Sequence, residues 1–234
     1  MENMKIIGLI GGVSWESSAE YYRLINQETK TRLGPEHSAE IMMYSMDFQP
    51  VAQLEHEGKW DDLTELLVDG VRRLERAGAD FVLVASNTLH KVADEVQRRI
   101  SVPLLHIADA TADEIRKTGV STVGLLGTRF VMEEDFYKEK LSARGIKVLI
   151  PDGSSRDCVH GIIYNELCLG QFLELSKEQV LKIITELAQA GAEAVVLANT
   201  ELPLLIRAPD THVKLFDTMA IHTRQAVSLA LGTG

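Results

Sequence analysis

Two stretches of this chain decide its fold: AGADFVLVASNTL at residues 77–89 and AGAEAVVLANTEL at residues 190–202. Each one reads as a Gly-Ala-acid turn, a short apolar run and a polar exit, which is the pattern of a buried strand and its loop. The two align without a gap, because Ser86 and Asn199 are separated by 199 − 86 = 113 residues, as are the turn glycines. We interpret one stretch as a copy of the other, with Ser86 and Asn199 at equivalent strand ends.

Weaker repeats extend this pairing over most of the chain. They relate residues 123–128 to 7–12 (124 − 8 = 116), residues 135–138 to 20–23 (135 − 20 = 115) and, most weakly, residues 215–218 to 107–110 (217 − 109 = 108). The offset drifts in the way that insertions and deletions in loops would produce. The repeats therefore indicate an internal duplication.

Apolar runs of strand length alternate with helical periodicity along both halves. The expected strands cover residues 6–12, 39–46, 81–85, 104–107, 147–150 and 194–198. The expected helices open at residues 13–18 with Ser17 or Ser18 as the cap, at Asp61 or Asp62, after Thr88 as far as about Ile100, and after Ser176. Such alternation predicts parallel βαβ units with right-handed crossovers.

The fold class that follows is α/β, with two similar domains related by internal duplication, each a mainly parallel β-sheet flanked by helices. We expect residues 1–105 plus about 208–234 to form the first domain, because a final strand and helix would return to it. Residues 106–207 would form the second domain.

Composition narrows the function classes. The chain has 234 residues and a formal net charge of −10, from 24 Lys and Arg against 34 Asp and Glu. This balance argues against nucleic-acid binding but not against small anions, which backbone dipoles can bind. The two cysteines, Cys158 and Cys168, match no metal or redox spacing, so we expect no disulfide scaffold. No stretch resembles a signal peptide or a membrane span, and we expect a cytoplasmic protein with no membrane partner.

Polar residues gather at the expected strand ends, where open parallel sheets bind their ligands. The loops there are residues 11–18, 47–48, 86–90, 127–129 and 199–201. Hydroxyl and amide donors with little fixed positive charge suit a carboxylate, and the donors that we name are Asn87, Thr88, Thr128 and Thr200. For any single one, capping a helix or closing a turn is the stronger interpretation, whereas for the duplicated pair ligand binding is stronger.

Several motifs in order resemble those of the aspartate/glutamate racemase family: IGLIGGVSWES at 7–17, NTLHK at 87–91, LGTR at 126–129, ELCLGQ at 166–171 and TE at 200–201. The resemblance implies two similar α/β domains with a ligand cleft between them, and a racemase that uses neither pyridoxal phosphate nor a metal ion. It also implies one cysteine from each domain that exchanges the α-proton on opposite faces of the substrate. Small amino acids, often acidic ones such as aspartate or glutamate, are then the substrates, and a homodimer is the expected assembly.

This chain departs from the family pattern at both catalytic positions. The family motif Cys-Asn-Thr reads Ser86-Asn87-Thr88, and Cys-Thr-Glu reads Asn199-Thr200-Glu201. A thiol can remove and return a proton, whereas a serine hydroxyl is a poor base without a partner and an asparagine amide is no base. The resemblance thus implies catalytic positions at Ser86 and Asn199 with weak or absent turnover. It implies a substrate-binding set of Gly11, Ser14, Trp15, Asn87, Thr88, Thr128, Thr200 and Glu201.

Three interpretations stay open at this point. The chain is a racemase weakened at both positions, by natural drift or by deliberate substitution. Alternatively, it is a relative with different isomerase or lyase chemistry, in which His90, Glu201 or Asp47 supplies the base. The third interpretation is a non-catalytic binder of a small carboxylate. Arg129 and Lys91 are the candidates for holding a second carboxylate of the ligand.

Overall fold

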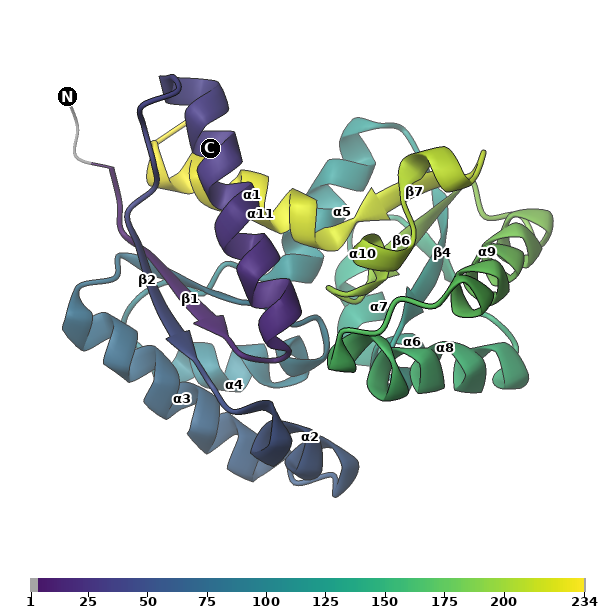
Figure 1. The fold of residues 1–234 in the computed structure, drawn as a ribbon, viewed down its shortest axis with the longest axis horizontal. Helices are drawn as coiled ribbons and strands as arrows, with labels where there is room; N and C mark the ends of the chain where they lie inside the picture. Colours follow the sequence, from purple (N-terminus) through teal and green to yellow (C-terminus); the bar gives the residue numbers. More distant parts are fainter. Residues whose placement is uncertain (1–3, 234) are drawn as a thin grey trace. The chain divides into compact units, whose positions relative to one another are not determined.

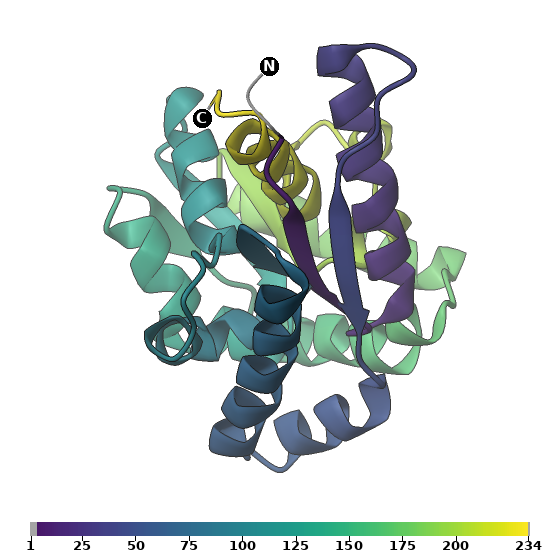
Figure 2. The same cartoon turned by 90° about the vertical axis from the view of Figure 1, so that its left-hand side faces the viewer.

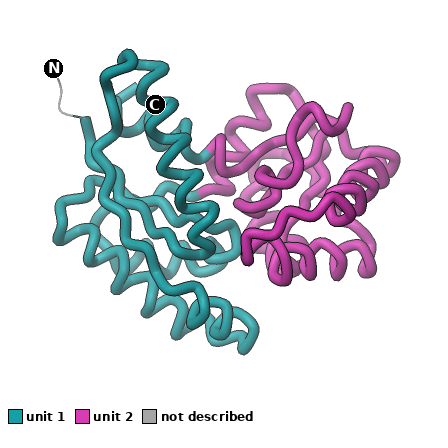
Figure 3. The backbone as a smooth tube through the Cα atoms, in the orientation of Figure 1, with its two compact units in different colours: residues 1–106, 222–234 teal, residues 107–221 magenta. Residues whose placement is uncertain are grey.

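The chain folds into two units of similar architecture. In the computed structural model, which describes residues 4–233, the first unit consists of the residues up to His106 and those from His222 onward. The second unit is Ile107–Ile221 (Figure 3). Each unit is a parallel sheet flanked by helices (Figure 1), and the expected α/β class is therefore confirmed.

The elements of the first unit are β1 (Ile7–Gly11), α1 (Trp15–Leu33), β2 (Ile41–Ser45), α2 (Phe48–His56), α3 (Trp60–Ala77), β3 (Phe81–Val84), the 3₁₀ helix η1 (Thr88–Val92), α4 (Ala93–Arg98) and the part of α11 (Thr218–Ala230) from His222 onward. Its three-stranded sheet has the order β2-β1-β3. All five residues of β1 are buried, as an uninterrupted apolar run predicts for a central parallel strand.

The helices α1 and α3 cover opposite faces of this sheet (Figure 2). A Cβ atom added at Gly70 of α3 would meet the side chains of Ile10 and Tyr44, whereas one added at Gly11 would meet Ser18 of α1. Successive residues of a strand point to opposite faces, so this alternation along β1 is the expected one.

The elements of the second unit are α5 (Ile107–Lys117), β4 (Thr122–Gly127), α6 (Arg129–Glu133), α7 (Asp135–Ser142), β5 (Lys147–Leu149), α8 (Gly153–Asn165), the 3₁₀ helices η2 (Leu167–Leu169) and η3 (Ala208–Asp210), α9 (Glu174–Gln189), β6 (Ala194–Ala198), α10 (Leu202–Leu205) and β7 (Lys214–Asp217), with the first turn of α11. The sheet order is β5-β4-β6-β7. Val196 of β6 belongs to one core, with α5 and α7, and Val195 and Leu197 belong to another, with α8 and α9.

Strand register supports the duplication that the sequence indicates. Ile7 pairs with Phe81 in the first sheet, and Val123 pairs with Ala194 in the second. The offsets between these pairs are 123 − 7 = 116 and 194 − 81 = 113, the same values that the sequence alignment has. Equivalent strands are therefore hydrogen-bonded in equivalent register.

The weakest sequence repeat, with its offset of 108, was wrong. Leu104 forms a single parallel bridge with Val82, and Leu215 pairs with Val195, the residue equivalent to Val82. The offset at this point is therefore 215 − 104 = 111. The same offset relates the start of α5 at Ile107 to the start of α11 at Thr218.

The chain returns to the first unit later than the sequence indicates. The strand β7 pairs in parallel with β6 and so belongs to the second sheet. Residues 208–221 consequently lie in the second unit, and the return begins at His222. The local sequence of β7 predicts a strand but carries no information about which sheet the strand joins.

Several expected boundaries shift. Ser14, not Ser17 or Ser18, is the N-terminal cap residue of α1, and both hydroxyls donate back to the Ser14 carbonyl oxygen. The expected strand at 104–107 is one bridge followed directly by α5. The remaining shifts are α3 starting at Trp60, the segment after Thr88 dividing into η1 and α4, and α9 starting at Glu174.

Among the residues described, no helix is both long enough and apolar enough to cross a membrane. Residues 1–3, on which part of the expectation about a leader segment depends, lie outside the described range.

We predict that Gly127→Ala destabilises the protein by about 1–3 kcal/mol, the usual cost of overpacking. A Cβ atom at Gly127 would lie 2.5 Å from the Ala198 carbonyl oxygen, which is backbone and cannot yield locally. Gly161→Ala in α8 is the matched control, since its Cβ meets nothing closer than the Asn165 amide nitrogen at 3.7 Å. Helix propensity should make that control neutral or stabilising by up to about 1 kcal/mol. Urea denaturation measures both, and equal stability of the two variants would contradict the prediction.

Candidate functional site

The strand ends of the first unit carry a buried polar segment directly after β3. Ser86, Asn87 and Thr88 are 6%, 2% and 5% exposed. The Ser86 hydroxyl accepts a hydrogen bond from the Leu89 backbone N–H at 3.3 Å, and so caps the turn that becomes η1. The imidazole Nδ1 of His90 lies 2.6 Å from the Ser86 carbonyl oxygen. The side-chain hydroxyl and the backbone carbonyl of Ser86 therefore both help to hold this segment.

The loop after β1 is shaped by close backbone approach. Gly12 has a φ of +86°, and a Cβ there would lie 2.0 Å from the Met46 carbonyl oxygen, so only glycine fits. The Gly12 N–H donates to the Ser18 hydroxyl at 2.8 Å, and Met46 N–H donates to the Gly11 carbonyl oxygen at 2.9 Å. Ser14 is buried in the same loop. The structure thus brings Gly11 and Ser14 to the carboxyl edge of the first sheet.

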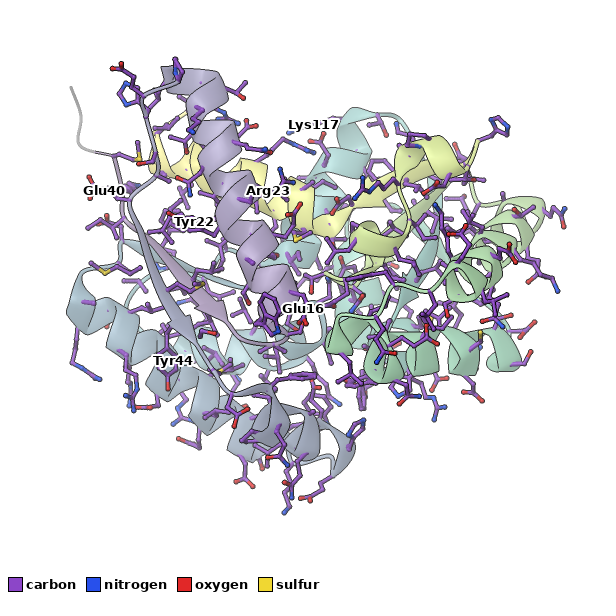
Figure 4. All side chains as sticks on the ribbon, in the orientation of Figure 1. Glu16, Tyr22, Arg23, Glu40, Tyr44 and Lys117 are labelled. Carbon is purple, nitrogen blue, oxygen red and sulfur yellow. The ribbon has the colours of Figure 1, made fainter. Side chains whose placement is uncertain are left out.

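Trp15 differs from its neighbours in the predicted binding set, because it is 68% exposed. Tyr22 is 53% exposed and lies on the same side of α1, seven residues further along. Figure 4 shows Glu16 at the start of this helix, with Tyr22 and Arg23 further along it. A role for Trp15 in ligand binding stays a prediction.

The strand ends of the second unit also form a hydrogen-bond network. Asn199 donates from Nδ2 to Glu201 Oε2 at 2.8 Å, and its Oδ1 accepts from the backbone N–H groups of Glu201 at 3.1 Å and Leu202 at 2.9 Å. The Thr200 hydroxyl lies 3.1 Å from both carboxylate oxygens of Glu201. All three side chains are at least 93% buried, since Asn199, the most exposed, is 7% exposed. The Asn199 amide therefore both closes the turn that leads into α10 and holds the Glu201 carboxylate.

The two predicted catalytic positions perform the same local task. Ser86 accepts from the N–H of Leu89, and Asn199 accepts from the N–H of Leu202, in each case three residues later. Leu89 and Leu202 are themselves related by 202 − 89 = 113. Closing a turn and belonging to a duplicated pair are therefore not alternative interpretations of Ser86 and Asn199, because the duplicated positions are also the ones that close the turns.

The other named residues are engaged in different ways. Thr128 caps α6 by accepting from the Val131 N–H at 3.4 Å, and Asp47 caps α2 by accepting from the Gln49 N–H at 3.2 Å. A guanidinium nitrogen of Arg129 lies 2.5 Å from an Asp157 carboxylate oxygen, and the Lys91 ammonium lies 3.8 Å from the centre of the Trp60 ring. Both candidate cations for a second carboxylate thus already have partners.

Three functional candidates were missing from the sequence-based set: Tyr21, His106 and His222. The Tyr21 hydroxyl lies 2.9 Å from Nδ1 of His222, whose Nε2 lies 2.8 Å from the Leu105 carbonyl oxygen. Complete burial, with the charge of His90 as a smaller cause, lowers the pKa of His222 to about 3. The available sequence signal is a histidine directly after an apolar run, as His106 follows Leu105, but the three residues come together only in the tertiary structure.

Within residues 4–233, no group of three or more His, Cys, Asp or Glu side chains is arranged to hold a metal ion. The two cysteines, Cys158 and Cys168, lie on the second unit and are not joined in a disulfide. Cys158 lies in α8 and Cys168 in η2, so neither lies at a strand end, where the resemblance implies the family thiols.

Comparison with known proteins gives one consistent result. Residues 10–226 match the family described as Asp/Glu/hydantoin racemase. A Yersinia pestis protein solved as a candidate Asp/Glu racemase is 46% identical, with a TM-score of 0.88 over 97% of this chain and 100% of that one. An aspartate racemase homologue from Pyrococcus horikoshii OT3 is 37% identical, with a TM-score of 0.83 over the same shares of the chains. The broad-specificity amino-acid racemase RacX of Bacillus subtilis (strain 168) is 24% identical over 97% of this chain and 98% of its own.

We predict that Asn199→Asp destabilises the protein by about 1–3 kcal/mol at pH 7.5, because a donor to a buried carboxylate is lost and a like charge is added. The new carboxylate would stand where Nδ2 now lies, 2.8 Å from Glu201 Oε2. The loss of stability should become smaller as the pH falls, since protonation of one of the two carboxyl groups removes the repulsion between them. Asn199→Ala is the control and should be destabilising without that pH dependence. Parallel pH profiles of the two variants in urea denaturation would contradict this assignment.

We also predict that His222 makes the stability depend on pH. Its folded-state pKa of about 3 lies below the ordinary value of 6.5, so below pH 6.5 the unfolded chain binds a proton that the folded chain does not. Stability should therefore fall with decreasing pH, by about 1.4 kcal/mol per pH unit once the pH is well below 6.5. His222→Gln keeps a donor for the Leu105 carbonyl oxygen and removes the titration. Urea denaturation from pH 7.5 to 4.5 gives the free energy of unfolding at each pH. Its slope against pH should correspond to about one proton fewer taken up on unfolding in the variant, and equal slopes would refute the prediction.

Proposed function

We infer that this protein, which belongs to the Asp/Glu/hydantoin racemase family of pyridoxal-phosphate-independent amino-acid racemases, binds a small amino acid at the strand ends of its two sheets. The proposed substrates are acidic amino acids such as aspartate or glutamate. The proposed chemistry is that of an isomerase, a 1,1-proton transfer at the α-carbon. Because Ser86 and Asn199 occupy the positions of the family cysteines, we propose that turnover is weak or absent.

One observation carries the proposal: Ser86 and Asn199 are equivalent by sequence offset, by strand register and by their capping bonds to Leu89 and Leu202. A two-base racemase needs one group on each face of the α-carbon. A duplicated pair of positions, one from each unit, suits that requirement. The names of the relatives favour the same substrate class, since one is an aspartate racemase homologue and another acts broadly on amino acids.

The proposed binding groups are those that the structure brings to the two sheet edges. They are Gly11, Ser14, Asn87 and Thr88 in the first unit and Thr128, Thr200 and Glu201 in the second, with Trp15 as a more exposed candidate. Backbone N–H groups and hydroxyls can hold the α-carboxylate without a nearby cation. Glu201 is the proposed acceptor for the substrate ammonium group, since a buried carboxylate is stabilised by an opposite charge.

Weak turnover follows from the chemistry of the two positions. A serine hydroxyl removes a proton only when a base assists it, and the Nδ1 of His90 donates to the Ser86 carbonyl oxygen, so this nitrogen is not available as that base. The Asn199 amide has no basic lone pair. Of the other candidate bases, Asp47 caps α2, and the Glu201 carboxylate is bound by Asn199 and Thr200.

The engagement of Asn199 with Glu201 favours a second candidate function, a non-catalytic binder of a small carboxylate. Such a protein would retain the binding groups of the family and lose proton transfer. A homodimer and a cytoplasmic location also remain predictions, and light scattering of the purified protein tests the dimer.

Deuterium exchange distinguishes the two functions. The protein is incubated with L-aspartate, L-glutamate or other single L-amino acids in D₂O, and deuterium at the α-carbon is followed by NMR. We expect slow or no exchange in the protein with Ser86 and Asn199 in place. Ser86→Cys combined with Asn199→Cys should raise the rate at least tenfold, because a thiol supplies the missing base on each side.

The matched control replaces the same two residues by alanine, which disturbs the same caps without adding a thiol. Circular dichroism and melting temperature establish that both double variants are folded. Exchange equal to that of the alanine control in a folded double-cysteine protein would contradict the placement of the two positions. A rise in melting temperature with L-aspartate but no exchange in any variant would favour the binder.

A further inference from the structure

Three histidine rings are packed together in the first unit, directly behind the Ser86–Thr88 segment. His90, His106 and His222 are 3%, 8% and 0% exposed. The ring centres of His90 and His106 are 4.6 Å apart, and those of His90 and His222 are 5.9 Å apart. Tyr21 of α1, which is fully buried, completes the group through its contact with His222. We call these four residues the histidine cluster.

The hydrogen bonds of the cluster determine its protonation pattern. A carbonyl oxygen only accepts, so His90 must carry a proton on Nδ1 to bond the Ser86 carbonyl oxygen at 2.6 Å. By the same reasoning His222 carries its proton on Nε2, toward the Leu105 carbonyl oxygen. Its Nδ1 is then the acceptor for the Tyr21 hydroxyl at 2.9 Å. The two rings are thus held as opposite tautomers.

The cluster also marks both places where the chain passes between the units. His106 is the last residue of the first segment of the first unit, and His222 is the first residue of its second segment. His90 contacts both rings and at the same time bonds the Ser86 carbonyl oxygen. One side chain therefore connects the segment after β3 with the two crossing points.

The internal repeat gives a comparison within the molecule. The residue equivalent to His90 in the second unit is Pro203 (90 + 113), and the residue equivalent to His106 is Asp217 (106 + 111). The cluster is therefore not part of the duplicated pattern, unlike the caps at Ser86 and Asn199. It occurs in the unit that is completed by a second chain segment, from His222 onward, which indicates that the cluster helps to attach that segment.

We propose that His90 is a positioning residue: its bond to the Ser86 carbonyl oxygen and its ring contacts with His106 and His222 hold the Ser86–Thr88 segment in place relative to both chain crossings. The importance of this segment for a ligand rests on the proposed function. The positioning itself does not, because it is a property of the unliganded protein. His90 acts here through Ser86 and is not itself a base in the reaction.

Two substitutions distinguish the contribution of the His90–Ser86 hydrogen bond from that of the imidazole ring contacts. His90→Asn keeps a side-chain N–H close to the position of Nδ1 but removes the ring, whereas His90→Phe keeps a ring and removes the donor. Backbone amide exchange of residues 86–90, measured by NMR, reports the order of the segment. We expect exchange to rise at least tenfold in His90→Phe, which loses the bond, and by a smaller factor in His90→Asn, which keeps the bond and loses the ring contacts. His222→Gln should raise exchange in the same segment, and Arg224→Gln, at an exposed position two residues further along α11, should not.

A second measurement on the unmodified protein needs no variant to fold. Imidazole ¹⁵N shifts should show His90 protonated on Nδ1 and His222 on Nε2 near pH 7.5. The reverse tautomer at His90, or unchanged exchange of residues 86–90 in a folded His90→Phe protein, would overturn the proposal. If L-aspartate fails to bind the natural sequence, the proposed function fails while the exchange and tautomer results still decide the role of His90. If L-aspartate binds, its affinity should fall at least tenfold in His90→Phe and by a smaller factor in His90→Asn.

Discussion

The hydrogen bond from a backbone N–H to a side-chain oxygen three residues earlier closes the turn after the third strand of each sheet. Ser86 makes this bond to Leu89, and Asn199 makes it to Leu202. A parallel strand must leave its sheet at the carboxyl edge, where its backbone groups lose their partners, and the cap supplies one of them. The polar residues that follow are thereby held at the edge where such sheets bind ligands. This bond is the one that both half-sites share.

The same constraint explains how the two positions could change chemistry without a change of fold. Serine and asparagine are both good caps, and a thiol is a weaker hydrogen-bonding group than either. The proposed replacement of family cysteines by Ser86 and Asn199 would therefore keep or strengthen the turn while removing the group that transfers protons. Asn199 also donates to the Glu201 carboxylate, which links the position after β6 to the residue two places further along the chain.

The two units use their shared framework differently. The second unit holds its strand end by a short-range network among Asn199, Thr200 and Glu201. In the first unit the strand end is attached to the rest of the molecule by His90, which reaches residues far away in the sequence. Tyr21 and His222 are 201 residues apart, yet their contact joins α1 to the last helix. The arrangement suits a unit whose final helix arrives from elsewhere in the chain.

The sequence by itself determined the α/β class, the duplication and the positions of Ser86 and Asn199, because apolar periodicity and residue spacing report which segments are buried and which end in polar loops. Only the tertiary structure decided that β7 joins β6, that the chain returns at His222, and that Arg129 and Lys91 are bound by Asp157 and Trp60. These features are pairings between distant residues, and a local pattern shows that a residue needs a partner without showing which one it finds. The histidine cluster is the clearest case, since each of its members reads alone as an ordinary buried side chain.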